Sequence, residues 1–148
     1  MSDMSEYLRL VTSDDMDLLF EWANDDSVRK NSFSSEKILY ESHKKWFAKL
    51  LEREDCRQYI YCVDDEPVGQ VRVTAEGERA EIGYSICAEK RGMGYGKRML
   101  HLVAEQVNKD LPQVQTLMGR VKPENIASSK VFLDLGYEEA YRQYEIRI

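Results

Sequence analysis

The sequence is short of cysteine, proline and long apolar runs, and each shortage excludes a class of protein. Only three of the 148 residues are cysteine, and none lies in a Cys-x-x-Cys pair or a spacing suited to zinc, so we predict neither disulfides nor a metal site. Three scattered prolines exclude a proline-rich chain. No apolar run approaches the roughly 20 residues of a membrane span, and residues 1–9 lack a basic-then-apolar secretion signal. We therefore expect a cytoplasmic protein with reduced thiols.

The composition predicts one compact domain over residues 1–148. The chain is 43% hydrophobic and 32% charged, which is typical of a globular domain of this length. Its net charge of -6 argues against nucleic acid or an anionic membrane as a partner. One segment departs from this balance, because residues 90–98 read KRGMGYGKR and contain four basic side chains and no acidic one. An acidic protein therefore keeps one local basic patch.

The hydrophobic pattern predicts an α/β (α+β) domain with a mixed, mostly antiparallel sheet and about four helices. The predicted order is β-α-α-β-β-β-α-β-α-β-β. A capping box at Thr12-Ser13-Asp14-Asp15 should open the first helix, and Asn125 and Gly136 should begin and end the last one. Strands are expected at 8–11, 58–63, 68–74, 80–87, 116–121, 137–140 and 144–148, and helices follow residue 15, span 35–53, run from the glycines to about 110, and span 125–135.

A glycine-rich segment, Arg91-Gly92-Met93-Gly94-Tyr95-Gly96, lies between a predicted strand and a predicted helix. There the backbone N–H groups and the helix dipole point at one place, which favours a phosphate. Two familiar phosphate loops fail on spacing. A Walker A loop needs Gly in place of Arg91 and Ser or Thr in place of Arg98, and the dinucleotide fingerprint needs Gly or Ala in place of Lys97. Taken alone, the segment also fits a helix entry with solvated basic residues.

The remaining pattern, R-x-x-G-x-G, resembles the acetyl-CoA pyrophosphate loop of the GNAT N-acetyltransferase superfamily. Residues 125–137, NIASSKVFLDLGY, are similar to the superfamily signature N-x-x-S-x-x-x-Y/F-x-x-L-G-F/Y. The likeness extends over nearly the whole chain through the order of predicted elements. It implies the GNAT fold and transfer of an acetyl group from acetyl-CoA to an amine, without a metal.

The resemblance also implies where the cofactor binds. The strand before the loop should splay from the strand at 116–121, and the gap should accept the pantetheine arm on backbone groups of Ile86 and Ala88. The alternative for Asn125 is a helix cap, and the alternative for Lys130 is a solvated lysine. The implied cofactor contacts are Ile86, Cys87, Ala88, Arg91, Gly92, Met93, Gly94, Tyr95, Gly96, Lys97, Asn125 and Lys130.

Catalysis of acetyl transfer needs a base that deprotonates the amine, a hydrogen-bond donor to the developing oxyanion, and a proton for the departing thiolate. Glu81 resembles the strand glutamate that serves as base in histone acetyltransferases of this superfamily, although a surface salt bridge explains it equally well. Backbone N–H groups near Ile86 and Cys87 are the implied oxyanion donors, and the Cys87 side chain fits a buried thiol better than a nucleophile. Phe132 stands where many relatives have an acidic tyrosine. The proton must then come from Tyr84, Tyr95 or Tyr137, come from water, or not be supplied.

The acceptor segment is rich in aromatic and hydrogen-bonding residues. Residues 21–33 resemble the W-x-N-D-x-x-V-R-x-x-S segment of bacterial GNAT enzymes that acetylate nucleotide-linked amino sugars. The likeness implies that Trp22 stacks on a sugar and that Arg29 and His43 meet a nucleotide. The alternatives are a core tryptophan, an Arg29 pair with Asp25 or Asp26, and a buried, hydrogen-bonded histidine.

Other functions remain open at this point. Acetylation of protein or peptide N-termini, of the ribosomal-protein type, is the first alternative. A non-catalytic acyl-CoA sensor is the second, because Phe132 lacks the acidic hydroxyl. We expect a small-molecule amine as the partner, and a homodimer through an edge strand near 144–148 is compatible with the fold.

Overall fold

A five-stranded sheet organises the computed structural model, which describes residues 4–148. Its strands lie in chain order, β1-β2-β3-β4-β5, with antiparallel pairing from β1 to β4 and parallel pairing between β4 and β5. The mostly antiparallel sheet of the prediction is confirmed. The strands are β1 (Glu6–Leu10), β2 (Cys56–Val63), β3 (Glu66–Glu76), β4 (Arg79–Ile86) and β5 (Thr116–Met118). The helices are α1 (Met16–Ala23), α2 (Asp26–Asn31), α3 (Tyr40–Glu52), α4 (Tyr95–Asp110) and α5 (Ile126–Asp134), with 3-10 turns at Ser13–Asp15 and Ala88–Lys90.

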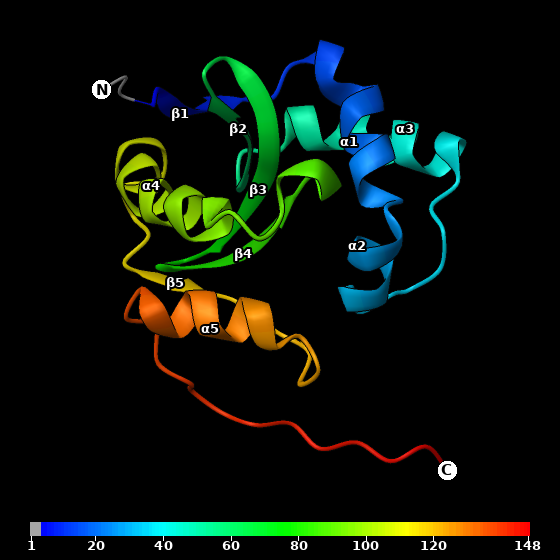
Figure 1. Ribbon diagram of the computed structural model, residues 1–148, viewed down its shortest axis with the longest axis vertical. Coiled ribbons are helices and arrows are strands. Elements are labelled where there is room, and N and C mark those ends of the chain that lie inside the picture. Colours follow the sequence, from blue (N-terminus) through cyan, green and yellow to red (C-terminus); the bar gives the residue numbers. More distant parts are fainter. Residues whose placement is uncertain (1–3) are drawn as a thin grey trace.

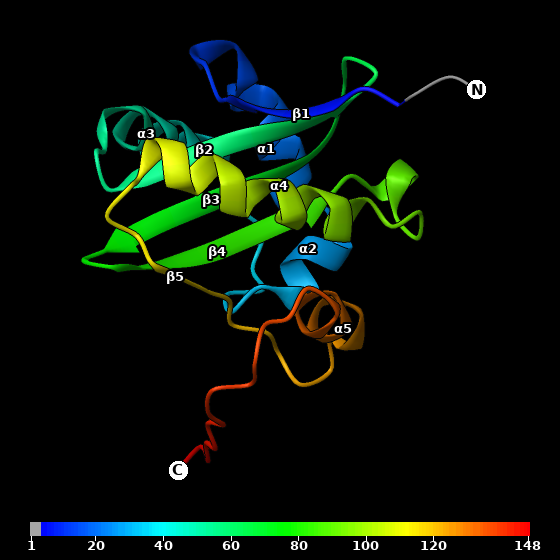
Figure 2. The same ribbon diagram turned by 90° about the vertical axis from the view of Figure 1, so that its left-hand side faces the viewer.

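Helices cover both faces of the sheet. Helix α4 lies on one face, and α1, α2 and α3 lie on the other, while α5 sits beside β5 (Figures 1 and 2). Successive side chains of a strand point to opposite faces. Ala80 and Ile82 of β4 therefore pack in the core under Met99 of α4, and Ile60 of β2 packs with Phe47 of α3 in a second core. No helix within residues 4–148 combines the length and apolar character needed to cross a membrane.

The predicted capping box is confirmed at the start of the first helical segment. The Thr12 amide donates to the Asp15 carboxylate at 2.8 Å, and the Thr12 hydroxyl accepts from the Asp14 amide. Arg9 of β1 donates to both Asp15 oxygens, at 2.8 and 2.9 Å. This bidentate bond lowers the pKa of the buried Asp15 carboxyl. The pair ties the first strand to the first helical turn.

The structure corrects the predicted helices between residues 24 and 53. The helix expected from residue 35 begins at Tyr40, and Leu39, placed on its buried face, is an extended N-cap residue that is 73% exposed. The short helix α2 was not predicted, so there are five helices in the described chain instead of about four. A six-residue helix spans too few turns to show a 3.6-residue period. Asp25 caps it by accepting from the Val28 amide at 3.1 Å.

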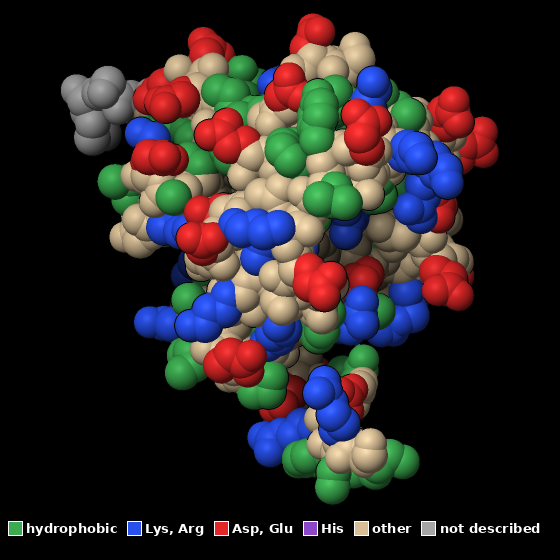
Figure 3. Space-filling view, turned by 90° about the vertical axis from the view of Figure 1, so that its right-hand side faces the viewer, with side chains coloured by type: hydrophobic (Ala, Val, Ile, Leu, Met, Phe, Trp, Pro, Cys, Tyr) green, Lys and Arg blue, Asp and Glu red, His purple; other side chains and the backbone are tan. Residues whose placement is uncertain are grey.

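The two strands predicted after residue 136 are wrong. Residues 138–148 form no helix or strand, and the segment projects from the body of the molecule below α5 (Figures 2 and 3). Its apolar side chains are exposed, with Tyr144 at 84% and Ile146 at 87%. A segment with β-like alternation forms a strand only when a neighbour supplies backbone partners, and α5 lies beside the β5 edge. The predicted homodimer stays a prediction, without the edge strand it assumed.

Close packing of α5 on the residue after β5 gives a stability prediction. A Cβ atom on Gly119 would clash with the Phe132 ring, which is itself buried. We expect Gly119→Ala to lower the free energy of unfolding by about 1 to 3 kcal/mol, since a buried ring has little room to move. Thermal unfolding measures the effect. Gly96→Ala is the control, because its Cβ would meet neighbours at an ordinary 3.6 and 3.8 Å, and equal melting temperatures for both variants would contradict the packing.

Candidate active site

The site begins where β4 loses its partner. Parallel pairing with β5 covers only Arg79, Ala80 and Glu81, and β4 continues to Ile86. The Cys87 amide donates to the Val68 carbonyl of β3 at 2.8 Å. Because hydrogen-bonding directions alternate along an antiparallel strand, Tyr84 and Ile86 direct their backbone groups away from β3, toward the β5 side. These backbone groups line the splay that was predicted to accept pantetheine. The internal bond of Cys87 argues against its amide as an oxyanion donor.

The glycine-rich loop follows this strand and opens α4. Gly92 and Gly94 have φ values of 76° and 82°, in the left-handed region that glycine occupies at little cost. Gly94 is the N-cap of α4, no side chain caps that helix end, and its first turn holds no acidic residue. Uncapped N–H groups and the positive end of the helix dipole favour an anion at this point. The loop therefore has the geometry expected of a phosphate-binding turn.

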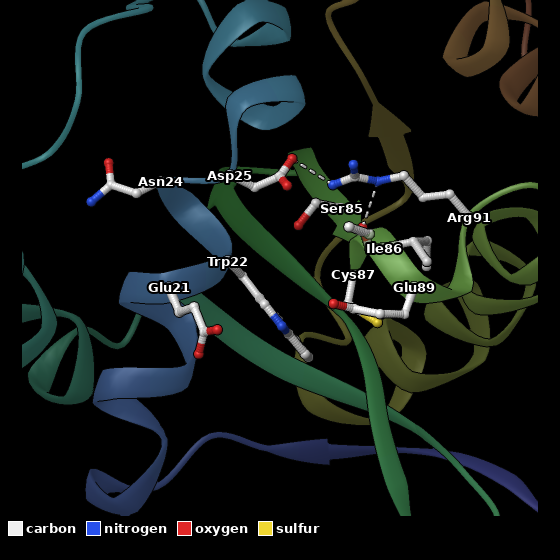
Figure 4. Close-up of a pocket in the computed structure, with 10 residues that line it drawn as sticks. Glu21, Trp22, Asn24, Asp25, Ser85, Ile86, Cys87, Glu89 and Arg91 are labelled. Carbon is white, nitrogen blue, oxygen red and sulfur yellow. Dashed lines mark hydrogen bonds and ion pairs between the residues drawn. The ribbon is translucent and has the colours of Figure 1, made fainter.

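Basic side chains surround the loop, but they are not equally free. Lys97 forms no ion pair within residues 4–148, whereas Arg98 is paired with Glu6 at 2.7 Å. Arg91 donates to the Ile86 carbonyl at 3.0 Å and to the Asp25 carboxylate at 2.7 Å, and Figure 4 shows these two bonds across the gap between α2 and β4. Arg91 therefore joins the acceptor segment to the end of β4.

Two cavities meet at the end of β4. The smaller, of about 270 Å³, lies between the α1–α2 junction and β4 and is drawn in Figure 4. The larger is a cleft of about 990 Å³ that runs over the sheet to α4 and α5, which is ample for a small-molecule site. Cys87 and Ala88 line only the smaller cavity, and Met93, Lys130 and Tyr137 line neither. The cleft brings together Trp22, Arg29, His43, Glu81, Tyr84, Ile86, Arg91, Gly92, Gly94, Tyr95, Gly96, Lys97 and Asn125.

Three residues that the resemblance implies as cofactor contacts have surroundings that do not require a cofactor. Met93 is 60% exposed, and Lys130 is exposed on α5. Asn125 accepts from the Ser128 amide at 3.3 Å and so caps α5, as the sequence predicts. A cap explains Asn125, and solvation explains Lys130, without a cofactor.

The Glu81 carboxylate is held by an arginine that the sequence did not single out. Arg120, in the segment between β5 and α5, donates to both Glu81 oxygens, at 2.5 and 3.3 Å. The Arg120 guanidinium also lies over the Phe33 ring, 4.8 Å from its centroid. Glu81 thus sits in the salt bridge that was the alternative to a catalytic base. A lone arginine in an irregular segment has no periodicity, so no sequence signal marked it.

Of the three candidate tyrosines, Tyr84 is the best placed to act in the cleft. Its hydroxyl lies 2.8 Å from the Ser128 hydroxyl of α5, and burial raises its pKa. Tyr95 lines the cleft but packs edge-on against Tyr61, with ring centroids 6.3 Å apart. Tyr137 packs against Phe132 at 4.9 Å outside the cleft, and burial raises its pKa too. Tyr84 is therefore the candidate proton donor that lies in the cleft, whereas Tyr137 has the surroundings of a packing residue.

The Cys87 thiol has the surroundings of an unreactive group. It is half-buried, and burial, with Glu89 beside it, raises its pKa. A thiol with a raised pKa stays protonated at neutral pH and is a poor nucleophile. Cys87 was predicted to be a buried strand thiol, but it follows the last residue of β4 and is half-buried. Its raised pKa agrees with the part of the prediction that gives the thiol no nucleophilic role.

Arg29 supports a loop instead of pairing with a carboxylate. Its guanidinium donates to the carbonyls of Ala23 at 2.6 Å and Ser34 at 3.1 Å, and Asn24 holds the same loop through two bonds to Ile38. Asp25 pairs with Arg91, and Asp26 pairs with Lys37, so neither expected partner is used. Arg29 fixes the segment that carries Phe33 over the cleft.

His43 is also bound internally. Only 3% of it is exposed, and its Nε2 lies 2.9 Å from the Met16 carbonyl. The ring packs among Phe20, Trp46 and Phe47 at 5.3, 5.4 and 6.2 Å. This matches the hydrogen-bonded, buried alternative. Trp22 differs, because it is half-buried and lines both cavities.

Solved structures share this architecture. A domain from Methanocaldococcus jannaschii DSM 2661 superposes with a TM-score of 0.83 at 24% identity, covering 97% of this chain and 94% of that one. Spermidine N-acetyltransferase from Vibrio cholerae, with CoA and spermine, has a TM-score of 0.83 at 16% identity, covering 97% and 87%. AAC(6')-Ib with ribostamycin and coenzyme A has a TM-score of 0.80 at 21% identity, covering 92% and 84%. At these identities the likeness shows the fold alone, and no curated protein sequence matches the chain.

The family is shown by sequence. The family model of the acetyltransferase (GNAT) domain matches residues 7–138, which include all of the sheet except Glu6, the glycine-rich loop and the Asn125 segment. The resemblance seen in the loop and in the last helix is therefore confirmed over nine-tenths of the chain. This protein belongs to the GNAT acetyltransferases, enzymes that take their acetyl group from acetyl-CoA.

Proposed function

We propose that this acetyltransferase modifies the primary amine of a small molecule. The observation that supports this is the continuity of the large cleft, which joins the glycine-rich loop at one end to Trp22 and Phe33 at the other. A donor held at the loop and an acceptor held by the aromatic residues would meet beside Ile86. Both reactants would then lie on the rigid floor of the sheet, as a transfer between two bound molecules requires.

The residues at the loop end fit coenzyme A. The open N-terminus of α4, the two left-handed glycines and Lys97 suit a pyrophosphate. The backbone groups of Tyr84 and the Ile86 amide, which β5 does not pair, suit the amides of pantetheine, whereas the Ile86 carbonyl is bound by Arg91. When bound, acetyl-CoA supplies an activated acetyl thioester. The chain's own task is to orient that thioester and to move protons.

Three groups are proposed to carry the chemistry. The Ile86 amide donates to the oxygen on which negative charge develops. Tyr84 donates a hydrogen bond, and then a proton, to the departing sulfur. Glu81 collects the proton lost by the amine. It lies five residues before Ile86 along β4, roughly 16 Å at 3.3 Å per residue, so this transfer runs through water.

An amino sugar is the acceptor we favour within this class. Trp22 and the exposed ring of Phe33 offer aromatic faces to a sugar, and a structural neighbour is a complex with the aminoglycoside ribostamycin. A nucleotide on that sugar would need partners other than Arg29 and His43, since both are bound internally. The position of Trp22 therefore supports the proposal of a sugar, whereas the proposal of a nucleotide on that sugar depends on the sequence resemblance alone.

The proposal is tested by offering acetyl-CoA with a panel of amines and weighing the products. The panel holds nucleotide-linked amino sugars, free amino sugars, polyamines and short peptides with varied N-termini. One added acetyl group on a small-molecule amine supports the proposal. Acetylation of peptides alone would contradict it, and binding of acetyl-CoA without any acetylated product would favour the sensor.

Glu81→Gln tests the proposed base. We expect kcat to fall by about tenfold near pH 6 and by less near pH 9, because the amine loses its proton with least help at high pH. The pH profile of kcat is the measurement. Arg120→Gln is the matched variant, since it removes the same ion pair but keeps the carboxylate. Equal profiles for the two variants would assign Glu81 to the salt bridge alone.

A further inference from the structure

The acceptor side of the cleft contains an arginine, Arg72, that has no role in the proposed chemistry and no ion pair with the other described residues. Of the charged side chains that line the cleft, Glu81 pairs with Arg120, Arg91 pairs with Asp25, and Lys90 lies 3.8 Å from Glu66. Arg72 forms no ion pair and no side-chain hydrogen bond with any described residue. Arg72 is half-buried, lies on β3 and lines the cleft.

The position of the Arg72 guanidinium is fixed from two sides. It lies over the Trp46 ring of α3, with its central carbon 5.4 Å from the ring centroid. On the β4 side it faces Gly83, its partner across the strands, and its Nη2 lies 4.0 Å from where a Cβ would stand on Gly83. Stacking on an indole holds a guanidinium without using its N–H donors. The donors of Arg72 thus remain available to a ligand in the cleft.

A polar ladder continues from Arg72 toward the donor end. Gln58, which is buried, donates to Gln70 at 2.6 Å, and Gln70 donates to the Ser85 hydroxyl at 3.0 Å. Ser85 lines both cavities and stands next to Ile86. Since its oxygen accepts from Gln70, the Ser85 hydroxyl is held in place and directs its own proton elsewhere. The cleft floor therefore carries a second polar group with a fixed position, the Ser85 hydroxyl, in addition to the Arg72 guanidinium.

We propose that Arg72 binds an anionic oxygen group of the acceptor, a carboxylate or a phosphate, while the amine of the same molecule lies near Ser85. This deepens the proposed function and rests on it. Gly83 and Ser85 face the same side of β4, two residues or about 7 Å apart, which sets the separation of anion and amine. A guanidinium binds such oxygens through two parallel N–H donors, which a neutral acceptor does not satisfy.

Two pairs of acceptors test the proposal, each differing only in the anion. They are 5-aminopentanoate against 5-aminopentanamide, and glucosamine 6-phosphate against glucosamine, with coenzyme A release as the readout. We expect the anionic member of at least one pair to have a 10- to 100-fold higher kcat/KM, mainly through KM, as a charged hydrogen-bonded pair predicts. The pair that shows the preference identifies carboxylate or phosphate. Equal kcat/KM within both pairs would overturn the proposal.

Substitutions of Arg72 test whether this residue causes the preference for anionic acceptors. Arg72→Met should bring the ratio of anionic to neutral kcat/KM close to one, and Arg72→Lys should keep part of it. Arg57→Met is the control, because Arg57 lies on β2 outside the cleft and bonds only to backbone carbonyls. If Arg72→Met kept the wild-type ratio of anionic to neutral kcat/KM, the proposal would be overturned.

Calorimetry separates this proposal from the proposed function. In the presence of coenzyme A, the preferred anionic acceptor should bind the wild-type protein and lose at least tenfold in affinity with Arg72→Met. Binding that depends on Arg72 in a protein that acetylates no amine would keep the anion site and refute the function. Acetylation of amines without any dependence on Arg72 would keep the proposed function and refute the anion site.

Discussion

Gly94→Glu is expected to abolish binding of coenzyme A, with a loss of at least 100-fold in affinity. Gly94 is the N-cap of α4 with φ at 82°, a conformation that costs a residue with a side chain about 1 to 2 kcal/mol. A Cβ there would meet nothing within 4 Å, so the new carboxylate would extend over the open helix end. Negative charge at that point repels a pyrophosphate and occupies the N–H groups that should bind it. Isothermal titration with coenzyme A measures the loss.

Gly77→Glu is the matched control for that variant. Gly77 has the same kind of backbone, with φ at 63° and open space around it, but it lies in the β3–β4 hairpin. It therefore introduces the same strain and the same charge far from the loop. Gly94→Ala adds the strain without the charge and should lose less affinity. Unchanged binding in Gly94→Glu would move the pyrophosphate away from this loop.

The second large effect is expected from Tyr84→Phe, which should lower kcat about 100-fold, in the range typical of a lost general acid. The hydroxyl lies 2.8 Å from Ser128, and burial raises its pKa, so the group stays protonated throughout the neutral range. Any alkaline loss of activity due to Tyr84 must therefore fall above pH 10, the ordinary pKa of the phenol. Steady-state kinetics between pH 6 and 10 give both results.

Tyr137→Phe controls for the loss of a tyrosine hydroxyl in the same aromatic cluster. Both tyrosines pack edge-on against Phe132, at 5.9 and 4.9 Å, and only Tyr84 lines the cleft. We expect Tyr137→Phe to change kcat by less than about twofold. Coenzyme A affinity should be similar in both variants, because neither hydroxyl is placed against the phosphates. A larger loss in Tyr137→Phe than in Tyr84→Phe would exchange their roles.

The backbone conformation of the glycine-rich loop could be predicted from the sequence, but the bonding partners of its Arg91 side chain could not. The spacing R-x-x-G-x-G predicts an anion site because its backbone conformation depends on local sequence, and Gly92 and Gly94 do adopt left-handed angles. The arginine itself bonds to Ile86 and to Asp25, a residue 66 positions earlier. No local pattern contains that partner, so its role as a link between the two halves of the site was not predicted.

The sequence by itself determined the features that depend on near neighbours in the chain. These include the Thr12 capping box, the three-strand meander, the helices around Met99 and Phe132, and the family, which is carried by two short motifs. Turn chemistry, capping and periodicity act over a few residues, so they can be read directly. The same rule explains the errors, because residues 137–148 have the alternation of a strand and no partner to pair with.

Only the tertiary structure decided which polar side chains are free to act. Arg29 and His43 look available in the sequence and are bound to backbone carbonyls, whereas no sequence pattern marks Arg72, which lines the cleft without an ion pair to any residue from 4 to 148. The availability of a charged group depends on every acceptor within hydrogen-bond reach, and most of those come from distant segments. Burial and hydrogen-bond partners are properties of the folded chain, and for this reason we propose the anion contact at Arg72 on the sheet and not at Arg29 or His43 on the helices.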